Sequence, residues 1–246
     1  MYYLEKARLA FVSAMFVSLA FVFCGTTFAD EVIHSYHSEV TVAESGELMV
    51  VETIKVRAEG NQIKRGIYRD FPTLFKTQMG VSVEVPFKVT SVLRDGQGET
   101  YRTERLKNGF RVYIGNPNVF LNAGDYTYTI EYTTDFQIAY YKEYDELYWN
   151  VTGNQWAFPI TEASATVRLP AGVDYSNLKT KSFTGADGSK ASNATVEASR
   201  DELKFRTTKP LEAQEGLTIV VAIPKGFIAE MTAEEYTQLY AEPTER

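Results

Sequence analysis

The run YTYTIEYT, residues 126–133, alternates strictly between large apolar and polar side chains. Tyr126, Tyr128, Ile130 and Tyr132 take every second position, with threonines and one glutamate between them. Successive side chains of a β-strand point to opposite faces, so this pattern is typical of a strand with one face in a core and the other in water. We therefore predict a half-buried strand here.

The same alternation recurs on both sides of this run. We predict a hairpin around the turn at 44–47, a second hairpin around Asn108-Gly109, and further strands at 36–42, 48–56, 81–94, 163–169, 194–199, 202–207 and 217–223. Many short strands with little helix predict an all-β, antiparallel β-sandwich. Thr232 and Glu235 form a capping-box pattern followed by apolar residues at helical spacing, which predicts a short C-terminal helix within 227–246.

Two places depart from the alternation. The segment KRGIYRDFP, residues 64–72, lies among glycines and a proline, and we expect a structured loop there. Glu52 interrupts an apolar row that should face the core. It is either a solvated edge residue or a buried carboxylate that requires a cation, for which Arg65 and Arg69 are the nearest candidates.

The first 29 residues have the composition of a secretory signal peptide. Lys6 and Arg8 precede an apolar run from Leu9 to Phe23, and Ala29 provides the small side chain that signal peptidase requires before its cleavage site. We therefore expect cleavage after Ala29. The expected location is extracytoplasmic: periplasmic, secreted or on the outer face of the cytoplasmic membrane. The only cysteine, Cys24, would leave with the signal. Residues 30–226 then form one domain that depends on core burial alone. The net charge of −7 argues against nucleic-acid binding.

The stretch ELYWNVTGNQWAFPI, residues 146–160, contains both tryptophans. They either fill the core or form a platform for a glycan or peptide of the cell envelope. In the 64–70 segment, Arg65 and Arg69 either bind an anion or a partner, or pair with Glu52, Asp70 or a carboxylate of 143–146. The candidate ligand-binding residues are Arg65, Arg69, Trp149, Asn150, Asn154 and Trp156.

No catalytic set, metal site or cofactor is indicated. The only histidines, His34 and His37, should point to opposite faces of a strand. With no other histidine, and no cysteine in the mature chain, we expect neither a Ser-His-Asp nor a Cys-His arrangement. The alternative is a carbohydrate-active enzyme that uses a carboxylate among Asp145, Glu146 and Glu162. Adjacent strand residues face opposite sides, so we favour a binding or sensing module over an enzyme.

Four stretches resemble one family, the domain of unknown function 2207, which is found at the N-terminus of predicted bacterial and archaeal membrane proteins. They are GELMVVE at 46–52, RGIYRDFP at 65–72, ELYWNVTGN at 146–154, and residues 156–170. The resemblance covers roughly residues 30 to 225 and implies no catalytic residues. Such proteins continue into transmembrane helices, so we expect either a stand-alone secreted version or the outer part of a membrane protein, with a membrane protein or its own transmembrane region as a partner.

Overall fold

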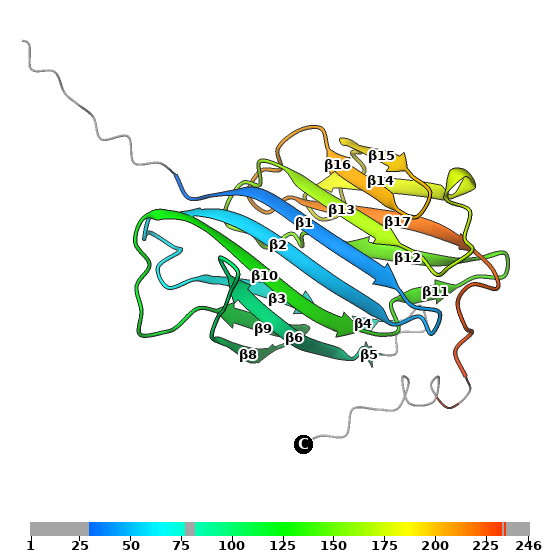
Figure 1. Ribbon diagram of the computed structural model, residues 1–246, viewed down its shortest axis with the longest axis horizontal. Helices are drawn as coiled ribbons and strands as arrows, with labels where there is room; N and C mark the ends of the chain where they lie inside the picture. Colours follow the sequence, from blue (N-terminus) through cyan, green and yellow to red (C-terminus); the bar gives the residue numbers. More distant parts are fainter. Residues whose placement is uncertain (1–29, 77–81, 233, 235–246) are drawn as a thin grey trace, which may run out of the picture.

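The computed structural model describes residues 30–76, 82–232 and 234, and Figure 1 shows the chain as a β structure throughout this part. The all-β prediction is confirmed, and η1 (Tyr175–Asn177) is a single 3-10 turn between strands. The predicted signal segment lies outside the described residues. So does nearly all of the predicted C-terminal helix, because residues 233 and 235–246 are not described.

One layer of the fold is an eight-stranded sheet with the order β15-β16-β13-β1-β2-β10-β6-β7. Its strands, in chain order, are β1 (Val32–Val42), β2 (Leu48–Ala58), β6 (Phe87–Arg94), β7 (Gln97–Gly98), β10 (Gly124–Thr134), β13 (Ala163–Arg168), β15 (Ala194–Ala198) and β16 (Leu203–Thr207). Neighbouring strands pair antiparallel except β1 and β13, which are parallel.

Smaller sheets form the second layer. The four-stranded sheet has the order β11-β12-β17-β14, and the three-stranded sheet has the order β3-β9-β8. Their strands are β3 (Ile67–Pro72), β8 (Tyr101–Leu106), β9 (Gly109–Ile114), β11 (Ile138–Tyr140), β12 (Tyr144–Asn150), β14 (Lys179–Gly185) and β17 (Gly216–Pro224). A separate ribbon pairs β4 (Leu74–Lys76) with β5 (Ser82–Glu84). In Figure 1 the four-stranded sheet lies behind β13 and β16, and the three-stranded sheet lies near β10 and β6.

The core fills the space between the two layers. Alternate residues of the long strands point inward, which is why the period-two pattern of the sequence located these strands. The buried row of the large sheet includes Tyr36, Val40, Leu48, Val50, Ile54, Val56, Tyr128, Ile130 and Tyr132, all 2% exposed or less. Leu147, Ile219 and Val221 face them from the four-stranded sheet, and Val112 and Ile114 from the three-stranded sheet.

Three local predictions were wrong. The single strand expected at residues 81–94 is two strands of different sheets, β5 and β6, on either side of Pro86. The segment at residues 64–72, expected to be a loop, contains β3, because Ile67, Arg69 and Phe71 alternate inward despite the flanking glycines. The hairpin between β8 and β9 exists, but its turn is one residue earlier than predicted, on residues 107 and 108. Gly109 is instead the first residue of β9, where a Cβ would lie 2.0 Å from the carbonyl oxygen of Phe71.

A buried ion pair joins the two layers. Glu52 is completely buried in the inner row of β2, and the guanidinium of Arg69 reaches it from β3. Nε of Arg69 donates to Oε2 at 3.0 Å and Nη2 donates to Oε1 at 3.1 Å. The hydroxyl of Tyr132 donates to Oε1 at 2.9 Å, and Nε of Arg69 also donates to the hydroxyl of Tyr36 at 2.9 Å. The buried-carboxylate hypothesis is therefore confirmed, with Arg69 rather than Arg65 as the cation.

We predict that Arg69→Met lowers the free energy of unfolding by about 3–5 kcal/mol, because it leaves the charge of Glu52 buried without a partner. The double variant Glu52→Leu/Arg69→Met should recover much of this loss, since no buried charge remains. Urea denaturation followed by circular dichroism measures both effects.

The matched control is Arg102→Met, which breaks an ion pair with Glu104 whose two side chains are 58% and 49% exposed. Solvent screens such a pair, so its loss should leave stability nearly unchanged. A loss in Arg69→Met no larger than in Arg102→Met would contradict a stabilising role for the buried pair.

Candidate functional site

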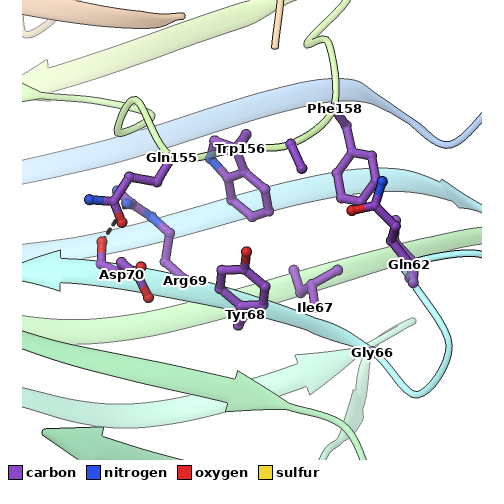
Figure 2. A pocket seen from close by; sticks show the side chains of 11 residues that line it. Gln62, Gly66, Ile67, Tyr68, Arg69, Asp70, Gln155, Trp156 and Phe158 are labelled. Carbon is purple, nitrogen blue, oxygen red and sulfur yellow. Dashed lines mark hydrogen bonds between the residues drawn. The ribbon is translucent and has the colours of Figure 1, made fainter. Parts of the chain in front are cut away.

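A pocket of about 60 Å³ opens between β3 and the turn that follows β12 (Figure 2). Two short segments of the chain supply its walls. One is the end of the 62–66 loop with the first residues of β3, and the other is residues 155–158. The lining residues are Gln62, Ile63, Gly66, Ile67, Tyr68, Arg69, Asp70, Gln155, Trp156, Ala157 and Phe158.

The pocket has an apolar interior held in a fixed position. Ile63, Ile67 and Trp156 are 2%, 6% and 7% exposed. The indole of Trp156 packs edge-on against Tyr36 of β1, with ring centroids 6.0 Å apart. Its Nε1 donates to the carbonyl of Thr152 at 2.8 Å, which satisfies the one polar group of the ring. The large sheet and the turn after β12 therefore fix the indole together.

Both charged residues of the pocket, Arg69 and Asp70, pair with side chains that lie outside the pocket. Arg69 pairs with Glu52, and Arg111 of β9 holds Asp70 through bonds of 2.6 and 2.7 Å from Nε and Nη2. Burial lowers the pKa of Arg69, but the charge of Glu52, the hydrogen bond to it and the hydroxyls of Tyr36 and Tyr132 together raise this pKa above its ordinary value. The hydrogen bond to Asp70 likewise raises the pKa of Arg111, whose guanidinium lies 4.0 Å from the ring centre of Tyr68. The pocket thus presents no unpaired charge.

A tight turn after β12 covers the guanidinium of Arg69. Asn150 accepts from the N–H of Gly153 at 3.0 Å and donates to Asn154 at 3.1 Å, and Asn154 in turn donates to the carbonyl of Gly185 at 3.0 Å. Gly153 has a φ of +72°, and a Cβ on it would lie 2.6 Å from Nη1 of Arg69. The two asparagines hold a turn in which a side chain at Gly153 would both strain the backbone and press on Arg69.

The structure brings together some of the predicted site residues. Arg69 and Trp156 line the pocket, and Asn150 and Asn154 build the turn beside it. Arg65 lies elsewhere, with its guanidinium 4.0 Å from the ring centre of the exposed Phe120. Trp149 is buried in β12 and belongs to the core. Ligand binding by these residues stays a prediction.

Sequence reasoning missed several lining residues. Tyr68 is 39% exposed at the rim, and Gln62 and Gln155 are exposed at the two ends of the pocket (Figure 2). Tyr68 could have been found from the alternation of β3, in which it takes a position between the two inward residues Ile67 and Arg69. The glutamines gave no comparable signal, because a lone exposed glutamine is typical of any loop.

The three carboxylates considered for a carbohydrate-active enzyme lie in different environments. Asp145 is completely buried and accepts from Nζ of Lys225 at 2.7 Å, whereas its neighbour Glu146 is half-buried. Glu162 accepts from Nη2 of Arg206 at 2.6 Å. The alternation of burial along β12 turns Asp145 and Glu146 to opposite faces, as the sequence predicted. Hydrolysis stays a prediction that no observation favours.

The histidines differ from expectation in one respect. A register shift between residues 33 and 35 places both on the outer face of the large sheet, instead of on opposite faces. They still point apart, because Nε2 of His34 lies 3.3 Å from Oδ1 of Asp125 and Nδ1 of His37 lies 2.8 Å from Oγ of Ser164. Burial lowers the pKa of His37. Within residues 30–76, 82–232 and 234, no cluster of three or more His, Cys, Asp or Glu side chains could hold a metal ion.

The fold and the pocket define a β-sandwich domain with a small neutral surface pocket. Residues 32–223 match the N-terminal domain of the predicted membrane proteins of DUF2207, the domain of unknown function 2207, and the chain belongs to this family. The uncharacterized protein YciQ of Escherichia coli K12 is 27% identical over 214 residues, which are 86% of this chain and 33% of that protein. The chain thus spans about a third of the length of this relative.

Solved structures resemble the fold at low sequence identity. Native yeast LTA4 hydrolase has a TM-score of 0.52 and 12% identity, over 79% of this chain and 29% of that one. The same enzyme in complex with bestatin has a TM-score of 0.48 and 13% identity, over 77% of this chain and 28% of that one. The first likeness concerns the fold alone, and the second is too distant to support any argument.

We predict that Gly153→Ala destabilises the protein more than Gly60→Ala. Gly60 has a similar φ of +76°, but a Cβ added to it would meet no atom within 4 Å, so its variant measures backbone strain alone, about 1–2 kcal/mol. Gly153→Ala must also displace Nη1 of Arg69 from the carbonyl of Asp70, a further loss of about 1.5–3 kcal/mol. Thermal unfolding of the two variants tests this. Equal losses of stability would show that Arg69 moves aside without a loss of free energy.

Proposed function

We propose that the chain is a non-catalytic extracytoplasmic binding module, and that its pocket takes a neutral group of an envelope glycan. The observation that supports this most strongly is the chemistry of the lining. Arg69 and Asp70 are both neutralised by partners outside the pocket, so an ionic ligand would find no free counter-charge there. A neutral polar ligand needs no counter-charge and requires only that the pocket replace its hydrogen bonds to water.

The remaining groups suit a sugar better than a purely apolar ligand. Tyr68 offers exposed aromatic surface, against which the C–H face of a sugar ring can pack, and Trp156 and Phe158 add aromatic surface to the lining. The exposed amides of Gln62 and Gln155 each present a donor and an acceptor, as hydroxyl groups require. Apolar walls with a few polar groups at the rim are typical of small-ligand sites.

The proposed location rests on the family and on the leader. The family is described as the N-terminal domain of predicted membrane proteins, and residues 1–29 have the composition of a signal peptide. In the part of the chain that the structure describes, no helix has the length and apolar character needed to span a bilayer. We infer that this domain is the outer part of a membrane-anchored protein, with the pocket facing the envelope.

We predict that the purified protein binds neutral oligosaccharides and that Gln155→Ala weakens this binding by roughly fivefold, the value of one hydrogen bond. Isothermal titration calorimetry against a panel of neutral glycans measures the affinity. Gln97→Ala is the matched control, since Gln97 is an exposed glutamine in β7, outside the pocket. Equal affinities of the two variants would remove the pocket from the binding site, and binding only to unglycosylated envelope protein would refute the glycan assignment.

We also predict that the native product begins at Asp30 and is digested by protease added to intact spheroplasts. The reason is that cleavage after Ala29 releases an extracytoplasmic domain, which an external protease can reach. N-terminal sequencing and immunoblotting measure the two properties. A product that survives until the cells are lysed would contradict the proposed location.

A further inference from the structure

The pocket lies along the backbone of β3 rather than over one of its faces. It contacts five consecutive residues, Gly66 and the first four residues of β3. Since successive side chains of a strand point to opposite faces, a void that touches all five must run beside the strand. β3 is an edge strand, paired with β9 on one side only. The pocket is therefore next to the free edge of β3.

The register identifies which backbone groups point to that edge. Thr73 directly follows β3 and Asn108 directly precedes β9. The N–H of Thr73 donates to the carbonyl of Asn108 at 3.0 Å, and this pair continues the register of β3 with β9. On the β8 side, the N–H of Gly115 donates to the carbonyl of Thr100 at 2.8 Å. Hydrogen-bonded pairs alternate along an antiparallel ladder, so even-numbered residues of β9 bond to odd-numbered residues of β3.

The even-numbered residues of β3 consequently direct their backbone groups to the free edge. Pro72, which has no N–H to donate, occupies such a position, where an edge strand tolerates proline. The carbonyl of Asp70 accepts from Nη1 of Arg69 at 2.7 Å. Among the described residues, the N–H and C=O of Tyr68 and the N–H of Asp70 have no ladder partner, so a ligand in the pocket can bond to them.

A secondary amide with a methyl group meets all the conditions of this pocket. Its volume of about 60 Å³ suits a group of a few heavy atoms. Ile63, Ile67 and Trp156 offer apolar surface for the methyl group, and the absence of unpaired charge excludes a carboxylate or an ammonium group. The N–H and C=O of a trans amide point in opposite directions. Its carbonyl can thus accept from Tyr68 while its N–H faces Gln155 across the pocket.

We propose that the pocket binds the acetamido group of an N-acetylated sugar, with the backbone N–H of Tyr68 as the donor to the acetamido carbonyl. This rests on the glycan-binding function proposed above and specifies its ligand. The acetamido group is favoured over the amide of a running peptide because residues 155–158 close the side opposite β3. A side group that projects from a sugar ring can enter such a pocket, whereas a continuous strand would have to pass through that wall.

The test titrates the full chain with three trimers, of N-acetylglucosamine, of glucosamine and of glucose. We expect the acetylated trimer to bind at least about tenfold more tightly than the glucose trimer, because only it places an amide and a methyl group in the pocket. In nuclear magnetic resonance spectra the backbone amide signals of Tyr68 and Asp70 should shift with the acetylated trimer. N-formyltrialanine amide, which has backbone amides but no acetyl group, serves as the peptide probe.

Two variants separate the contribution of the Tyr68 backbone N–H from that of its ring. Tyr68→Pro removes both the ring and the N–H at a free-edge position, and Tyr68→Ala removes the ring but keeps the N–H. The preference for the acetylated trimer should persist in Tyr68→Ala, whatever the loss of overall affinity, and disappear in Tyr68→Pro. If Tyr68→Pro does not fold, the amide shifts in the unmodified protein decide.

The outcomes separate the two proposals. Equal binding of the acetylated and glucose trimers would overturn the acetamido assignment and leave the glycan-binding function standing. Binding of the peptide probe as tight as that of the acetylated trimer would also overturn it, in favour of a peptide ligand. If no trimer binds, the glycan-binding function itself fails and the acetamido assignment fails with it.

Discussion

The ion pair between Glu52 and Arg69 is the constraint on which the arrangement of the layers depends. A carboxylate that is completely buried in the inner row of β2 is costly unless a cation and further donors surround it. Arg69 supplies the cation from the opposite layer, and Tyr132 adds a hydroxyl. Because these groups come from β2, β3 and β10, the pair fixes β3 beneath the middle of the large sheet.

The same strand positions the pocket. With Arg69 directed inward, the residues on either side of it in β3, Tyr68 and Asp70, must take the opposite orientation. Asp70 is then neutralised by Arg111 from β9, and that guanidinium also packs against the ring of Tyr68. The burial of Glu52 therefore requires a charged residue in β3. All the charges of this strand are paired, so its accessible edge carries no free charge. The neutrality of the site follows from the way the core is built.

The sequence predicted much of the fold and little of the site, for physical reasons. Long strands such as residues 126–133 bury one apolar face, so their period is visible in the sequence. β3 was not recognised because its inward row is Ile67, Arg69 and Phe71, and a charge in that row removes the apolar period. Glu52 showed that a cation was needed, but which arginine would reach it depended on the strand pairing. The approach of Trp156 to β3 is a contact between distant segments that neither segment indicates alone.

The pocket exists because the second layer is divided at this point. After β12 the turn at 150–154 crosses the guanidinium of Arg69, and Gly153 passes so close that a side chain there would displace Nη1. The chain then runs on through Trp156, which packs against Tyr36 instead of pairing with β3. The edge of β3 is therefore left unpaired but covered, which protects it from pairing with another chain. The same geometry that protects the edge leaves a space that a small amide can occupy and a strand cannot.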